Sequence, residues 1–158
     1  MMRRRTRLLQ VASIVVAMLL ALLPLPDAIV PFRPFWMALV LAYWVLEHGD
    51  DSGLGVAFLI GLLLDVVQGT LLGEYALRLV VIAFLLDRFR SRLRFYPIWQ
   101  QVLAIAALLV NDWIVTAIVH AFLGQPQLPI ATLGAAAVGA VLWGPVYALL
   151  ATLDRGRR

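Results

Sequence analysis

Cysteine and lysine are both absent from this sequence of 158 residues. Without cysteine the chain cannot form a disulfide, a thiol nucleophile or a thiolate metal site. Without lysine it has neither the phosphate-binding lysine of a P-loop nor a Schiff-base lysine. Serine occurs three times and histidine twice, and these few residues form no Ser–His–Asp pattern. We therefore expect no enzymatic activity, no bound cofactor and no metal site.

Charged residues are also scarce. They make up 14% of the chain, against 63% hydrophobic residues, and the mean hydropathy is +0.94. A soluble domain is ordinarily about 45–50% apolar and about 25% charged. The composition excludes a disordered chain, disfavours a soluble globule and predicts an integral membrane protein. The pI of about 10.3 comes from arginines that flank apolar runs. We therefore attribute the basic charge to membrane topology, and we expect the chain to lie in a lipid bilayer and to bind no nucleic acid.

The apolar runs are numerous enough for several membrane crossings, because a spanning helix requires about 20 residues. We predict a single polytopic membrane domain over residues 1–158, an all-α bundle of about six transmembrane helices. The predicted spans are residues 8–23, 34–47, 54–68, 71–87, 98–122 and 130–153. The first run follows basic residues like a signal peptide but lacks a small-x-small cleavage site, and we expect it to remain as a span.

The sequence leaves the path of two of these spans open, and it predicts how a third is anchored. The runs 54–68 and 71–87 are short, so a partly re-entrant hairpin covered by protein is an alternative to two full crossings. Aromatic residues near both ends of the run 34–47, among them Tyr43 and Trp44, predict a helix anchored at the membrane interfaces.

Arginine placement predicts the orientation, because basic residues resist translocation across the membrane. With six crossings, eleven of the thirteen arginines fall on the side of the N-terminus: Arg3, Arg4, Arg5, Arg7, Arg88, Arg90, Arg92, Arg94, Arg155, Arg157 and Arg158. We expect a protein of the bacterial inner membrane with both termini in the cytoplasm. The basic segment 88–94, expected as a loop, sets this topology or binds anionic lipid or a cytoplasmic partner.

Asp65 is an ionisable residue inside an apolar run, where a charge is costly and ordinarily faces a partner within the bundle. It shares a helix face with Gly61 and Gly69 at i, i+4 spacing, and small residues there allow another backbone to approach closely. Arg78, with Glu74 one turn before it, is the predicted partner of Asp65. The cluster is read as a network that joins two helices, as a partner-binding face, or as a transport site.

Two further groups of residues are candidates. Asp112, Thr116 and His120 recur every four residues on one helix face, which predicts hydrogen bonding inside the bundle, with a proton relay as the alternative. In the last run, small residues four apart predict close helix packing, and Trp143-Gly144-Pro145 predicts a kink because proline removes a backbone hydrogen bond.

These residues resemble the MreD family of bacterial rod shape-determining proteins. The similarity covers nearly the whole chain, and its most specific stretch runs from Gly61 to Gly73. Other similar stretches are 33–36 leading to 43–44, then 94–101, then 142–147. The last departs from the family's frequent Trp-Pro pair, because Gly144 separates Trp143 from Pro145.

The resemblance implies a non-enzymatic scaffold of the elongation machinery that directs sidewall peptidoglycan synthesis. It implies partners named MreC, MreB, RodA and the elongation transpeptidase. It also implies an architecture similar to the substrate-binding subunits of vitamin transporters. A small-molecule-binding subunit of a transporter remains the alternative function, on the ground of the polar residues expected inside the bundle: Asp65, Glu74, Arg78, Asn111 and Asp112. A homo-oligomer also remains open. The residues expected to serve packing or partner binding are Gly61, Asp65, Gly69, Gly73, Glu74, Arg78, Asp112, Trp143 and Pro145.

Overall fold

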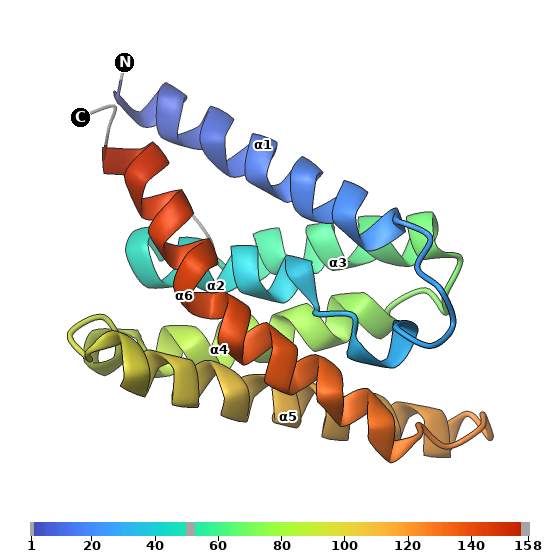
Figure 1. The fold of residues 1–158 in the computed structure, drawn as a ribbon. Helices are drawn as coiled ribbons and strands as arrows, with labels where there is room; N and C mark the ends of the chain where they lie inside the picture. The colour runs from blue at the N-terminus through green and yellow to red at the C-terminus, as the bar shows by residue number, and fades with distance from the viewer. Residues whose placement is uncertain (1, 50–52, 156–158) are drawn as a thin grey trace.

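A computed structural model describes residues 2–49 and 53–155 of the chain, which form six α-helices and two short 3-10 helices. The helices are α1 (Met2–Leu22), α2 (Trp36–His48), α3 (Leu54–Gln68), α4 (Glu74–Leu93), α5 (Ile98–Phe122) and α6 (Leu133–Arg155), with η1 (Val30–Phe32) before α2 and η2 (Ile130–Thr132) before α6. The predicted all-helical fold is confirmed. Successive helices run back and forth, so that α1 begins and α6 ends at the same end of the molecule (Figure 1).

Helix α2 lies at the centre of the bundle (Figure 1), where it contacts α1, α4 and α6. Every residue from Met37 to Leu46 is buried, as expected for a helix that is apolar all round. The expected interface belt is therefore wrong for Tyr43 and Trp44, which lie in the core. The indole Nε1–H of Trp44 donates to the Ser13 hydroxyl of α1 over 2.8 Å, because a buried indole N–H requires an acceptor.

Helices α3 and α4 form the tightest pair. The backbone of α4 lies so close to Gly61 that a Cβ atom on this residue would lie 2.6 Å from the backbone nitrogen of Ala76. The turn between the two helices uses Gly69 and Gly73, with φ angles of 65° and 105°. Glycine adopts these left-handed angles without steric cost, and the chain reverses within a few residues.

The prediction that 88–94 is a loop is wrong, because α4 continues through Leu93. Arginine is a good helix former, and no glycine or proline interrupts the segment before Pro97. Cationic side chains also favour the C-terminal end of a helix, where the dipole is negative. The basic segment is thus the last turns of a helix rather than a connection. Helix α6 likewise continues past Pro145 to Arg155.

Two helical segments within the described residues are long and apolar enough to cross a bilayer, Ile98–Phe122 and Ile130–Asp154. The apolar helical segments Thr6–Leu22 and Leu54–Gln68 are shorter.

Candidate functional site

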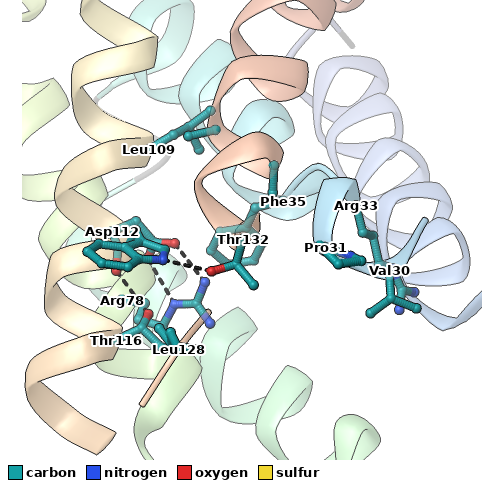
Figure 2. Close-up of a pocket in the computed structure, with 13 residues that line it drawn as sticks. Val30, Pro31, Arg33, Phe35, Arg78, Leu109, Asp112, Thr116, Leu128 and Thr132 are labelled. Carbon is teal, nitrogen blue, oxygen red and sulfur yellow. Dashed lines mark hydrogen bonds and ion pairs between the residues drawn. The ribbon is translucent and has the colours of Figure 1, made fainter. Parts of the chain in front are cut away.

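The main polar cluster lies at the end of the bundle that holds the α1–α2, α3–α4 and α5–α6 connections, here called the turn end. Arg78 of α4 and Asp112 of α5 face each other there (Figure 2). The Arg78 Nε–H donates to Asp112 Oδ1 over 2.8 Å, and its Nη2–H donates to Oδ2 over 2.6 Å. Both side chains are largely buried. Bidentate pairs of this kind are among the strongest charge-assisted hydrogen bonds.

Two aromatic rings also pack against the Arg78 guanidinium. Its Cζ lies 4.6 Å from the ring centroid of Phe35 and 4.7 Å from that of Tyr75. A cation over an aromatic face is attracted by the ring quadrupole. Phe35 directly precedes α2 and Asp112 lies on α5, so this arginine of α4 connects three helices.

The predicted pairing of Asp65 with Arg78 is wrong, because Asp65 binds the start of α4 instead. Its Oδ1 accepts from the Tyr75 backbone N–H over 2.8 Å, and its Oδ2 accepts from the Gly73 N–H over 2.9 Å. The Thr70 hydroxyl also donates to Oδ1 over 3.1 Å. The first N–H groups of a helix lack partners within the helix and carry positive partial charge. A carboxylate from α3 therefore caps α4.

Several other predicted site residues lie near the Arg78–Asp112 pair or near the Asp65 cap of α4. Gly61, Gly69 and Gly73 shape the contact and turn between α3 and α4. Glu74 Oε1 lies 3.6 Å from His120 Nε2, which links α4 to α5 near the turn end. The Thr116 hydroxyl donates to the Asp112 carbonyl over 2.9 Å. Asp112 and His120 contact α4, whereas the hydrogen bond of Thr116 lies within α5.

Two hollows border Arg78. The first has a volume of about 240 Å³ and lies between α5, η1 and η2; Arg78, Asp112 and Arg33 are among its lining residues. Figure 2 shows Val30, Pro31 and Arg33 across from the Arg78–Asp112 pair. The second has a volume of about 510 Å³ and is lined by residues of the α3–α4 turn together with Glu74, Arg78 and His120. Because Asp112 neutralises the charge of Arg78, this arginine offers hydrogen-bond donors rather than net charge to a group that enters either hollow.

A second polar cluster, missed by the sequence reasoning, lies at the opposite end of the bundle, here called the arginine-rich end. The Tyr147 hydroxyl of α6 donates to Glu47 Oε1 of α2 over 2.8 Å, and Arg94 Nη2 lies 3.9 Å from Glu47 Oε2. The Arg90 Nε–H donates to the Leu46 carbonyl over 3.1 Å. These contacts satisfy carbonyls and charge at the C-terminal end of α2.

Trp143 belongs to the packing around this cluster. It is fully buried, and its indole N–H donates to Gln101 Oε1 over 3.4 Å. The Gln101 amide donates in turn to the carbonyls of Leu93 and Tyr96, over 3.2 and 3.1 Å. A polar Gln pair at the start of an otherwise apolar run was the sequence signal for this role. Pro145, two residues after Trp143, lies inside α6.

No three His, Asp or Glu side chains within the described residues come together as a metal-binding group.

Comparisons with known proteins were made on the whole chain. The sequence model of a family described as rod shape-determining protein MreD matches residues 2–153. A protein of Haemophilus influenzae named Rod shape-determining protein MreD is 32% identical over 145 residues, which covers 89% of this chain and 87% of that protein. No solved structure matches the chain.

Proposed function

This chain belongs to the MreD family of rod shape-determining proteins, and we propose that it acts as a non-enzymatic membrane scaffold of the bacterial elongation machinery. In this proposal it binds MreC and, through the same assembly, MreB, RodA and the elongation transpeptidase. Rod shape follows because the assembly directs sidewall peptidoglycan synthesis. The observation that carries the proposal is the family match over nearly the whole chain.

The use of the polar side chains supports a scaffold rather than a catalyst. Asp65 caps a helix, Arg78 and Asp112 bind each other, and Glu47 accepts from Tyr147. Each contact joins two helices of the bundle. Groups that hold helices together in this way fix a shape that a partner can recognise.

The outer surface supports a position within the bilayer of the inner membrane. Large apolar side chains project outward from several helices; examples are Leu8 at 66% exposed, Leu59 at 65% and Val141 at 74%. Such surfaces mark contact with lipid or other proteins. We propose a six-span bundle, with α2 shielded at its centre by its neighbours.

The arrangement of the connections supports cytoplasmic termini. The start of α1, the α4–α5 connection and the end of α6 lie at one end of the molecule (Figure 1), and arginines are concentrated in these segments. This clustering follows the rule that basic segments stay in the cytoplasm.

Purification from membranes with identification of co-purified proteins tests the scaffold proposal. We expect the full chain to retain an MreC protein and to restore rod shape to round cells that lack their own MreD. Failure on both counts, for a chain that inserts and remains helical, would overturn the scaffold role. A matched pair of tagged proteins, with the tag at either terminus, controls for tags that block the interaction.

The alternative function, a small-molecule-binding subunit of a transporter, is favoured by the two hollows beside Arg78. The larger, of about 510 Å³, lies within the range of small-ligand sites, roughly 300–1,000 Å³, and the smaller, of about 240 Å³, lies below it. Native mass spectrometry of the protein purified from cells tests this function. A retained small molecule that is lost in Arg78→Leu would support it, and a protein free of small ligands that still restores rod shape would exclude it.

A further inference from the structure

A groove between α4 and α5 lies close to the arginine-rich end, away from the hollows beside Arg78. Its volume is about 430 Å³. Its lining is mostly apolar and includes one amide, that of Asn111; the apolar residues are Leu85, Phe89 and Leu93 of α4 and Ala104, Ala107 and Leu108 of α5. Residues Leu85 to Arg92 span seven helical steps, and with a rise of about 1.5 Å per residue the groove follows roughly 10 Å of helix.

Arg92 and Tyr96 line the groove where it approaches the arginine-rich end. Both residues are exposed. Neither Arg92 nor Arg88, one turn earlier, makes an ion pair with another of the described residues. The other two arginines of this segment do have partners. Arg94 Nη2 lies 3.9 Å from Glu47 Oε2, and the Arg90 Nε–H donates to the Leu46 carbonyl. The mouth of this groove therefore carries the positive charge of Arg92, which no acidic side chain among the described residues neutralises.

We propose that the groove binds an anionic phospholipid of the surrounding leaflet, with one acyl chain along the apolar walls and the phosphate beside Arg92 and the Tyr96 hydroxyl. The inference rests on the membrane position given in the proposed function. Arginine binds phosphate through charge-assisted hydrogen bonds, and tyrosine favours the headgroup level of a membrane. Apolar walls below a cationic mouth match the two parts of such a lipid.

The size of the groove favours an acyl chain over a helix of a partner protein. A helix is about 10 Å across and rises about 5.4 Å per turn. A groove of 430 Å³ therefore has room for only about one turn of a partner helix. An extended hydrocarbon chain instead runs along the whole groove. The negative charge of the headgroup then occupies the mouth, which a neutral lipid would leave uncompensated.

Native mass spectrometry of the full chain in detergent, with phosphatidylglycerol or phosphatidylcholine of identical acyl chains added, tests the proposal. We expect one phosphatidylglycerol to be retained in preference to phosphatidylcholine. Arg92→Gln is expected to weaken phosphatidylglycerol binding about fivefold, the factor for one basic residue near an anionic surface. Ala107→Trp, which fills the groove, is expected to remove the retained lipid.

Two matched variants keep the test specific. Arg7→Gln removes the same charge on α1, and Val141→Trp adds the same bulk at an exposed position of α6. Both are expected to bind phosphatidylglycerol as the unaltered chain does. Circular dichroism confirms that each variant remains helical.

Several results would overturn the lipid site. One is equal retention of the two lipids, and another is equal weakening by Arg92→Gln and Arg7→Gln. A third is cross-linking of Ala107→Cys in membranes to a neighbouring protein, which would assign the groove to that protein. If these variants restore rod shape while no lipid is retained, the lipid site fails and the scaffold role stands. If the chain is recovered from cells without detergent, the membrane position itself fails.

Discussion

Arg78 and Asp112 place opposite charges on two helices, largely away from solvent. Removing one partner of a buried pair leaves an uncompensated charge, at a cost of about 3–5 kcal/mol, whereas replacing both by apolar residues is often neutral. We expect Arg78→Leu and Asp112→Leu each to lower the free energy of unfolding by about that amount. The double variant should lose much less than the sum. Unfolding in detergent measures all three, and additive losses would contradict a direct pair.

Asp65 has a different role, because its partners are backbone N–H groups. Asp65→Ala leaves the partly buried N–H groups of Gly73 and Tyr75 without this acceptor, at a cost of about 1–3 kcal/mol. We expect faster hydrogen exchange at the amides of the first turn of α4. Asp87→Ala, at an exposed position of the same helix, should leave that exchange unchanged. Unaltered protection of these amides in Asp65→Ala would show that the carboxylate does not cap α4.

The sequence predicts that Asp65, Arg78 and Asp112 face the interior, because charges inside apolar runs avoid lipid. It does not predict which groups pair. Nearness in the chain favours Asp65 with Arg78, but the two left-handed glycines of the intervening turn bring the backbone of α4 to Asp65. Arg78 is then free to bind Asp112, 34 residues away. Pairing between helices depends on the turn geometry, which charge spacing does not encode.

Helix α3 approaches α4 at Gly61, where backbone meets backbone. We expect Gly61→Ala to lower the stability of the fold by about 1–3 kcal/mol, as overpacking does, because the new Cβ would lie 2.6 Å from the Ala76 nitrogen. Gly55→Ala, on the same helix with open space around it, should be neutral or slightly stabilising. Thermal unfolding in detergent compares the two. Equal stability of both variants would exclude a tight crossing at Gly61.

The same crossing changes how the predicted partner-binding face is interpreted. Gly61 and Asp65 are buried between α3 and α4, so their small-residue face is already occupied within the chain. Loss of partner binding in a variant at either position is expected to come from a displaced α3–α4 hairpin. Small residues at i, i+4 spacing predict close packing from sequence, but they do not distinguish an internal helix from an external one.

Some helix boundaries can be predicted from the local sequence and others cannot. Residues 54–68 and 98–122 are predicted as α3 and α5 with their observed bounds, since glycine or proline borders each run. The bounds of α4 differ because hydropathy ends at Asp87 while helix propensity continues through the arginines to Leu93. Hydropathy predicts which residues lie in lipid, and the helix itself ends only where the backbone pattern changes.

At the scale of the whole molecule, the six-span proposal places the α4–α5 and α5–α6 connections on opposite sides of the membrane. The absence of cysteine permits a clean test, because single cysteines can be introduced at Phe95 and at Gln125, both exposed residues of these connections. We expect a membrane-impermeant thiol reagent added to intact spheroplasts to label Gln125→Cys and to spare Phe95→Cys until the membrane is opened. Basic residues around Phe95 favour its retention in the cytoplasm, and α5 is long enough to cross between the two sites.

A thiol at Val141, within α6, serves as the control, since lipid should exclude the charged reagent under both conditions. Labelling of both connections from outside would mean that α5 does not cross the bilayer, which would overturn the six-span proposal.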